Sequence, residues 1–422
     1  MNNDSPSAGR DLTRPENLFW VRDFQFFLLG RFVGTLGMMV QSVAVGWHVY
    51  NLTSSPLALG YVGLAQFLPI IMFTLSAGDI ADRVDRRLIV ALGGAVQAIS
   101  SLWLIVLTLR GVADVRWFYA ALFVFGVARA FAVPASRSFV PLLVAKQQIP
   151  RAIAISSSIF QSSAIMGPAL GGALYVFGPA TTYIASALLF LTMTLSFSLI
   201  KTKPVPVIAD PGISTLARVM AGVSYIRHSP IVLGAVSLDL FAVLLGGAVA
   251  LLPIFARDIL HVGPEGLGVL RSAPAIGALL LNFLIIARPP QRHTGLLMFG
   301  CIALFGITII IFGLSTNFWL SLGALTIMGS ADMVSVYVRS TLVPLATPVA
   351  MLGRVTAVEM LFIGASNELG EFESGLTAGW FGTVPAVIIG GIGTLGIVAI
   401  WMWLFPDLRK VDKLADVKPV EI

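Results

Sequence analysis

Twelve long apolar stretches follow one another along the chain, and they restrict its folding more than any other feature of the sequence. They lie at about 24–50, 57–77, 88–109, 116–136, 152–176, 180–200, 230–255, 265–287, 295–315, 318–338, 354–379 and 384–405. A helix needs roughly 20 apolar residues to cross about 30 Å of hydrocarbon. Stretches this long favour helices over the shorter strands of membrane barrels, because each backbone group must be bonded within the protein. The sequence therefore predicts an all-α membrane protein with twelve transmembrane helices.

The composition excludes several classes of protein. Charged residues make up 11% of the chain, against about 25% in soluble domains, and the partner we expect is a lipid bilayer. The net charge of +6 comes from basic residues in short loops, so it does not indicate binding to nucleic acid. We expect no enzyme, metal site or cofactor, because no phosphate-binding loop is present and Cys301 lies in an apolar stretch. The histidines are scattered near predicted helix ends, at His48, His228, His261 and His293.

Basic residues alternate between the loops in a way that predicts the orientation of the chain. Most of the 27 lysines and arginines lie in the N-terminal segment, in the C-terminal tail and in the loops after even-numbered helices. The loops after odd-numbered helices hold only Arg110, Arg116 and Arg257. By the positive-inside rule, both termini are expected in the cytoplasm, and the first helix is expected to serve as its own insertion signal.

A break at 201–229 divides the apolar stretches into two sets of six. It contains Pro204, Pro206 and Pro211 and then an amphipathic segment, which predicts a linker followed by a helix on the cytoplasmic membrane face. We predict a cytoplasmic N-terminal segment at 1–23, six-helix bundles at 24–200 and 230–405, and a cytoplasmic tail at 406–422. Spaced residues recur between the bundles: Arg151, Gly167 and Gly172 match Arg354, Gly370 and Gly375, and Pro56 and Gly60 match Pro264 and Gly268.

The charged hairpin between the second and third helices carries the most specific motif. Its sequence, Gly78-Asp79-Ile80-Ala81-Asp82-Arg83-Val84-Asp85-Arg86-Arg87, resembles the signature loop of the major facilitator superfamily of transporters. The resemblance implies the major facilitator fold, in which two six-helix pseudo-repeats surround a central site. It also implies a latch of the outward-open state, with Asp82 near the start of a later helix and the arginines paired with acids of the other half. The latch residues are Gly78, Asp82, Arg83, Arg86 and Arg87.

A few charged residues fall inside the predicted helices, where charge is costly unless it faces a cavity or a partner. They are Arg31, Arg129, Asp239, Arg271 and Asp332, together with four glutamates of helix eleven. The repeat offset suggests two pairs across the cavity, Arg31 with Asp239 and Arg129 with Asp332. The alternative is that both arginines extend toward the cytoplasmic interface.

The acids of helix eleven are Glu359, Glu368, Glu371 and Glu373, and the helical period places them on more than one face. Carboxylates in a low dielectric bind protons more readily, as a proton-coupled exporter requires. Our proton candidates are Asp239, Asp332 and Glu368, with Arg271 and Glu359 also on the pathway. A structural role for the helix-eleven acids is an equal alternative.

Helix five contains Gly167, Pro168, Gly171 and Gly172, which predict a tightly packed hinge. The run is similar to the core of the antiporter motif of superfamily exporters, although Ser163 stands where that motif has an earlier glycine. A purely structural packing seam is the alternative.

Shorter motifs resemble the enterobactin-exporter branch of the superfamily, which also holds macrolide-efflux proteins. They are Trp47-x-Val49-Tyr50, Phe67-Leu68-Pro69 and Leu252-Pro253-x-Phe255-Ala256. The resemblance implies an exporter of a siderophore or another bulky amphipathic small molecule, driven by the proton gradient, in the bacterial inner membrane. A multidrug or macrolide efflux pump is the alternative, and a sensor or channel on the same fold is a third reading. We expect a monomer, and association with an outer-membrane efflux partner is an alternative.

Overall fold

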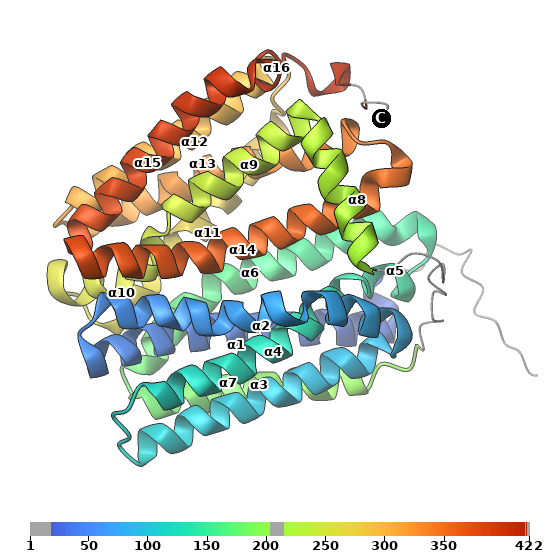
Figure 1. Cartoon of the computed structure of the whole chain (residues 1–422). Coiled ribbons are helices and arrows are strands. Elements are labelled where there is room, and N and C mark those ends of the chain that lie inside the picture. Colours follow the sequence, from blue (N-terminus) through green and yellow to red (C-terminus); the bar gives the residue numbers. More distant parts are fainter. Residues whose placement is uncertain (1–17, 203–214, 418, 420–422) are drawn as a thin grey trace, which may run out of the picture.

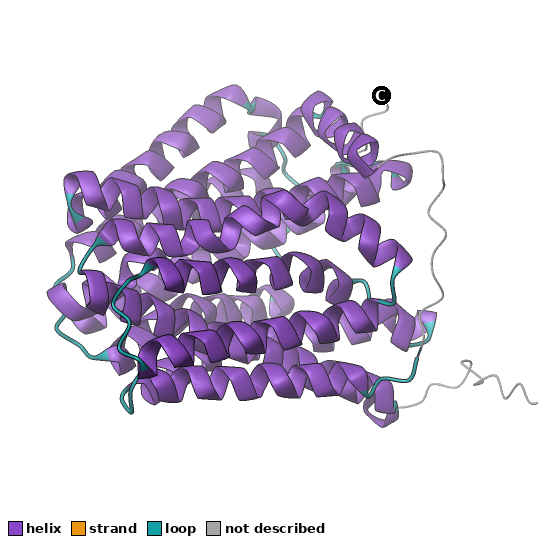
Figure 2. Cartoon of the chain, turned by 60° about the horizontal axis from the view of Figure 1, so that its bottom comes forward, coloured by secondary structure: helices purple, strands orange, loops and turns teal. Residues whose placement is uncertain are grey.

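The computed structural model of the chain describes residues 18–202, 215–417 and 419 (Figure 1). These residues form helices joined by short loops, with no strand among them (Figure 2). Twelve helices are long and apolar enough to span a membrane, which confirms the predicted fold class and the helix count.

Six of the long helices come from the first half of the chain and six from the second. The first six are α1 (Arg22–Thr53), α2 (Pro56–Arg83), α3 (Arg86–Leu109), α4 (Arg116–Arg137), α6 (Ile149–Tyr175) and α7 (Pro179–Ser198). The second six begin with α9 (Pro230–Leu245), which is followed by α11 (Pro264–Ala287), α12 (Thr294–Leu314), α13 (Phe318–Leu345), α14 (Val349–Phe381) and α15 (Thr383–Leu404).

Short helices lie at both ends of the molecule. Those at one end are η1 (Leu18–Trp20), α5 (Val140–Leu143), η2 (Lys146–Gln148), α8 (Thr215–His228), α16 (Pro406–Arg409) and η5 (Leu414–Asp416). We call the end with α5 and α8, at the right of Figure 1, the basic face, because Arg86, Arg87 and Lys146 lie there. The end with α10 (Leu252–Ile254), at the left of Figure 1, is the opposite face.

Helix starts follow from local chemistry. Proline begins α2, α7, α9 and α11, where its missing N–H has no partner to lose and its fixed φ suits the first turn. Asn317 caps α13, since its side-chain oxygen accepts hydrogen bonds from the backbone N–H groups of Trp319 (2.9 Å) and Leu320 (3.1 Å).

The seventh span is broken, although the sequence predicts one helix over 230–255. α9 ends at Leu245, and the chain continues through η3 (Ala248–Leu251), α10 and the π-helical turn η4 (Phe255–Ile259). Gly246 and Gly247 lie at the break. A Cβ at Gly247 would lie 2.4 Å from the carbonyl oxygen of Gly370, so the break lets α14 approach the backbone closely.

Two glycine seams join the halves, and they use the residues that recur between the bundles. A Cβ at Gly172 of α6 would lie 2.3 Å from the carbonyl oxygen of Pro264 in α11 and 3.0 Å from the Cα atom of Gly268. The second seam repeats this arrangement, with Gly375 of α14 against Gly60 of α2. The recurring residues of the sequence therefore form equivalent backbone contacts between the halves.

The apolar core changes along the length of the helices. At the opposite face one buried cluster includes residues of both halves, such as Val43 and Trp47 of α1 together with Phe255 and Phe312. Toward the basic face the halves have separate clusters. Phe27, Phe139 and Phe197 belong to the first, and Met298, Phe299 and Val338 belong to the second. Among the described residues, the two bundles thus share an apolar core at one end and have separate apolar cores at the other.

Candidate functional site

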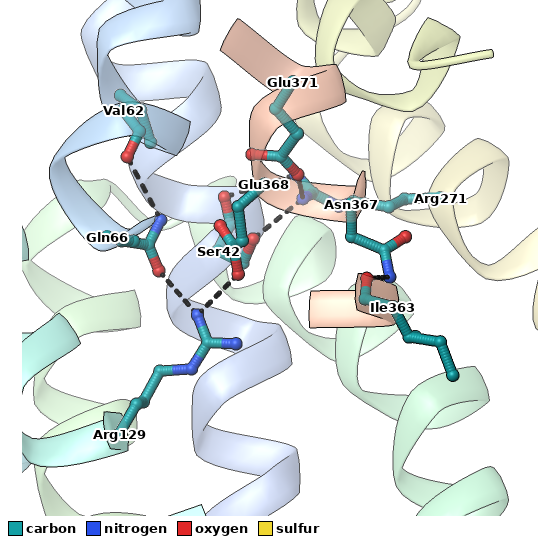
Figure 3. A network of polar contacts seen from close by, with 9 residues as sticks. All are labelled: Ser42, Val62, Gln66, Arg129, Arg271, Ile363, Asn367, Glu368 and Glu371. Atoms are coloured by element: carbon teal, nitrogen blue, oxygen red, sulfur yellow. Dashed lines mark hydrogen bonds and ion pairs between the residues drawn. The ribbon is translucent and has the colours of Figure 1, made fainter. Parts of the chain in front are cut away.

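Five helices bring polar and charged side chains together near the middle of their length (Figure 3). We call this group the central network. Its members are Ser42 of α1, Gln66 of α2, Arg129 of α4, Arg271 of α11, and Glu368 and Glu371 of α14. The first three helices belong to one half of the molecule and the last two to the other.

Arg129 forms the ion pair that joins the halves. Its Nη1 atom lies 3.0 Å from Oε1 of Glu368 and donates a second hydrogen bond to Oε1 of Gln66 at 3.3 Å. Gln66 in turn donates to the carbonyl oxygen of Val62 at 3.5 Å, within its own helix. The Nε atom of Arg129 is buried and has no hydrogen-bond partner among the described residues. The guanidinium group therefore has donor capacity that the network does not use.

Arg271 reaches across the interface in the other direction. Its Nη2 donates to the hydroxyl of Ser42 at 2.8 Å, and its Nη1 donates to the carbonyl oxygen of the same residue at 3.4 Å. Nη2 also lies 4.0 Å from Oε1 of Glu371. Each half thus contributes one arginine to the network.

The sequence places the two glutamates on one side of α14. Glu368 and Glu371 are three residues apart, a spacing that puts side chains on neighbouring positions of a helix face. Glycine on the facing helix allows the approach, since a Cβ at Gly63 of α2 would lie 2.8 Å from the Cβ of Glu371. Asn367 points elsewhere and donates to the carbonyl oxygen of Ile363 at 2.8 Å.

The network is screened from solvent without being sealed. The side chains of Glu368 and Arg271 are 13% and 16% exposed, and those of Arg129 and Glu371 are 20% and 28% exposed. Burial to this degree strengthens electrostatic interactions relative to water. The remaining exposure gives water and small molecules a route to the same groups.

Both predicted pairs across the cavity are wrong. Asp239 forms an ion pair with Arg339 of α13 in its own half, and Arg129 pairs with Glu368 instead of Asp332. Arg31 donates from Nε to the carbonyl oxygen of Ser156 at 3.3 Å and lies 5.9 Å from the ring centre of Phe160, both in α6. The repeat offset predicts that equivalent residues lie at equal depth in the membrane. It does not predict how each helix is rotated about its axis, and this rotation decides which side chains meet.

Glu359 and Asp332 lie beside the Asp239–Arg339 pair. Oε1 of Glu359 is 3.2 Å from Nε of Arg339, and Asp332 interacts electrostatically with Asp239 and Arg339. Glu373 belongs to neither group, because its carboxylate accepts a hydrogen bond from Thr377 of the same helix at 2.8 Å. The four helix-eleven acids are therefore divided among three environments.

The charged hairpin is partly described. Gly78 lies within α2, and the side chains of Asp82 and Arg83 are outside the described residues. Arg86 donates to the carbonyl oxygen of Ser138 at 3.2 Å, and Arg87 donates to that of Ile200 at 2.5 Å, both in the first half. The latch role of the hairpin stays a prediction.

The glycines of the predicted hinge pack against two different helices. Gly167 and Gly171 face α1, near Met39 and Val40, whereas Gly172 faces α11 across the seam. α6 runs unbroken from Ile149 to Tyr175 through Pro168. These contacts describe a packing surface, and bending at this position stays a prediction.

A second polar contact between the halves, which the sequence did not predict, lies at the opposite face. We call it the clasp, and it consists of Tyr50, Asn51 and Ser54 with Arg257 and Asp258 of η4. The hydroxyl of Tyr50 donates to Asp258, and Arg257 donates to the carbonyl oxygen of Tyr50, to Asn51 and to Ser54, each at 3.3 Å. Its one sequence signal is Arg257, a rare basic residue on that side.

All hydrogen bonds between described residues of the two halves lie from mid-length to the opposite face. Two such bonds lie outside the central network and the clasp. Gln161 donates to the carbonyl oxygen of Ala275 at 2.9 Å, and Ser272 donates to the carbonyl oxygen of Ile165 at 2.8 Å. Together with the shared apolar core, they close the molecule at the opposite face.

Comparison with known proteins agrees with this architecture. Residues 19–420 match the family of transmembrane secretion effectors. The chain is 25% identical over 397 residues to the enterobactin exporter EntS of Citrobacter koseri, covering 92% of each protein. It is 24% identical over 417 residues to macrolide efflux protein A of Streptococcus pyogenes, covering 93% of this chain and 98% of that protein.

Solved structures share the fold at low sequence identity. A variant of the nucleoside transporter NupG superposes with a TM-score of 0.74 at 13% identity, covering 92% of this chain and all of that one. A bacterial homologue of the iron transporter ferroportin, in an inward-facing state, gives a TM-score of 0.68 at 15% identity, covering 93% of this chain and 99% of that one.

Proposed function

Because the chain belongs to the transmembrane secretion effector family of major facilitator transporters, we propose that it is a proton-coupled exporter. Its cargo is a siderophore or another bulky amphipathic small molecule, moved by alternating access. It resides in the bacterial inner membrane with the basic face toward the cytoplasm. In that orientation, the contacts that close the opposite face support an inward-facing state.

The observation that carries the proposal is the ion pair between Arg129 and Glu368, 3.0 Å apart on opposite halves. A charge in the middle of a membrane helix costs about 2.5–3.5 kcal/mol, so such residues are kept where they have a function or a partner. Rocking of one bundle against the other separates the two helices and leaves both charges without partners.

A proton supplies the compensation that this separation needs. Binding of a proton to Glu368 removes one of the two charges and frees the guanidinium group of Arg129 for cargo or water. The contact with Gln66 keeps the arginine hydrogen-bonded in that form. Opening of the network is thereby linked to protonation, which is the basis of proton coupling.

The direction of transport and the kind of cargo follow from the relatives. One is an enterobactin exporter and another a macrolide efflux protein, and both names describe outward transport. A macrolide or multidrug efflux pump is the second candidate function, favoured by the 98% coverage of macrolide efflux protein A. The two readings share the mechanism and differ in the cargo.

Transport in proteoliposomes with an imposed pH difference tests the proposal. Enterobactin and the macrolide erythromycin serve as separate probes. We expect one of them to accumulate only when protons flow down an imposed gradient in the opposite direction, and Glu368→Gln to abolish that accumulation. The matched control is Glu265→Gln, which makes the same change at an exposed helix start and should leave transport unchanged. Movement of both probes without regard to the gradient would refute proton coupling.

A further inference from the structure

A second charged group lies in the second half of the molecule, away from the interface between the halves. Arg339 of α13 stands between carboxylates of two neighbouring helices, in an ion pair with Asp239 of α9 and 3.2 Å from Glu359 of α14. The side chains of Arg339, Asp239 and Glu359 are 5%, 7% and 12% exposed. We call these three residues and Asp332 the acidic cluster.

The acidic cluster has more acids than bases. Asp332 and Glu359 both interact electrostatically with the same two charged neighbours, Asp239 and Arg339. One guanidinium group thus faces three carboxylates. Of the other helices packed on this part of the molecule, α12 and α15 contain no charged residue, and Arg271 of α11 belongs to the central network, where it lies near Glu371. Full ionisation would leave two uncompensated negative charges in a buried place, which is strongly unfavourable.

Asp332 is the carboxylate that the arginine does not neutralise directly. Among the described residues, the ion pairs of Arg339 are with Asp239 and Glu359. Asp332 stands two helical turns earlier on α13, nearer the middle of the membrane span. It can therefore exchange a proton without breaking an ion pair.

A buried hydroxyl group beside Asp332 gives independent support. Ser335 is 1% exposed, and its Oγ has no hydrogen-bond partner among the described residues. It follows Asp332 by three residues and precedes Arg339 by four, so all three side chains share one face of α13. A buried hydroxyl group without a partner is rare and indicates a missing one. A protonated carboxyl group on Asp332 is the donor that this oxygen lacks.

We infer that Asp332 is a proton-binding site, with Ser335 accepting from the protonated carboxyl group while Asp239 and Glu359 remain paired with Arg339. The proton comes from water on one side of the membrane and returns to water on the other. Every member of the acidic cluster lies in one half, so the site moves as a unit during rocking and carries its proton with it. This assignment rests on the proposed proton-coupled export.

Infrared difference spectroscopy of the reconstituted protein during a pH titration tests the site without any cargo. The titration uses a Glu368→Gln background, which removes the carboxylate that the proposed function protonates. We expect a carbonyl band of a protonated carboxylic acid that titrates in this background and is lost when Asp332→Asn is added. The band should shift when Ser335→Ala is added instead, because that change keeps the acid and removes the hydroxyl group. The control Asp114→Asn alters an exposed acid in a loop of the opposite face and should keep the band. A band at the same position that still titrates after Asp332→Asn is added overturns the assignment.

Transport measurements distinguish failure of this inference from failure of the proposed function. In Asp332→Asn we expect that a pH difference no longer stimulates transport of the probe, while counterflow exchange of the same probe continues. Loss of both activities, or retention of both, overturns the assignment. Failure of the unmodified protein to respond to a pH difference would refute proton-coupled export, whereas the infrared result would still decide whether Asp332 binds a proton.

Discussion

At the scale of single residues, the central network depends on charges that the membrane would otherwise exclude. Arg129 and Glu368 each have their ion-pair partner in the opposite half, so the charge of each is left uncompensated when the other is removed. Breaking a buried pair costs more than the pair contributes, because the remaining charge stays buried.

Exchanging the two charges tests this dependence. Arg129→Glu alone places two acids together and should lower the free energy of unfolding by about 1–3 kcal/mol, less than for a fully buried pair because both side chains are partly exposed. The double variant Arg129→Glu with Glu368→Arg should regain part of that loss. Thermal unfolding in detergent measures both, and a double variant no more stable than the single ones would contradict a direct pairing.

Glycine positions give a second prediction at this scale. Gly172→Ala puts a methyl group against the backbone of α11, and overpacking of this kind costs about 1–3 kcal/mol. We expect a lower melting temperature and slower transport. Gly300→Ala on α12 is the matched control, because a Cβ there meets nothing within 4 Å, and alanine favours the helix. Equal effects of the two substitutions would show that the seam is not tightly packed.

Residue types were easier to predict from the sequence than residue partners. The intramembrane charges of Arg129, Asp239 and Asp332 were visible because they interrupt apolar stretches. Their partners were not, since pairing depends on how each helix is rotated about its axis. Arg339 was missed as a partner because it lies near the end of α13 and was assigned to a loop.

At the scale of elements, the clasp joins the end of α1 to the π-helical turn η4. A π-turn widens the helix and redirects side chains, and such turns are often found at functional positions. Here it places Arg257 and Asp258 side by side toward α1. Alternating access requires this contact to break when the opposite face opens.

A cysteine pair across the clasp tests that requirement. Asn51→Cys with Arg257→Cys, in a Cys301→Ser background, should be joined in the inward-facing state by a reducible bis-methanethiosulfonate cross-linker, whose length replaces the arginine side chain that now places Nη1 3.3 Å from Oδ1 of Asn51. Cross-linking should then abolish transport, and reduction should restore it. Each single cysteine variant should be insensitive to the cross-linker. Transport that continues in the cross-linked protein would mean that the opposite face does not open.

Element lengths were predictable because hydrophobic length is a strong signal, and each of the twelve spans lies close to its predicted range. The break in the seventh span was not predictable from hydropathy. Gly246 and Gly247 are compatible with a continuous membrane helix, and the break reflects the approach of α14, a contact far away in the sequence. The clasp was missed for the same reason.

At the scale of the whole molecule, two similar halves meet along two equivalent glycine seams. Gly172 packs against Gly268 and Gly375 against Gly60, so the recurrence seen in the sequence has a physical cause in the shared geometry of the interface. Symmetric seams allow one half to rock against the other without loss of contact. The single core at the opposite face and the separate cores at the basic face fit one end point of that motion.

Distances between spin labels on the two halves test the central claim, which is that the halves rock against each other and separate the Arg129–Glu368 pair. One pair of labels replaces the exposed residues Ala113 and Thr316 at the opposite face, and another replaces Gln147 and Ala350 at the basic face. Between neutral and acidic pH, with and without the transported probe, we predict that one distance lengthens as the other shortens. Distances that change in the same direction at both faces, or at neither, would contradict the account.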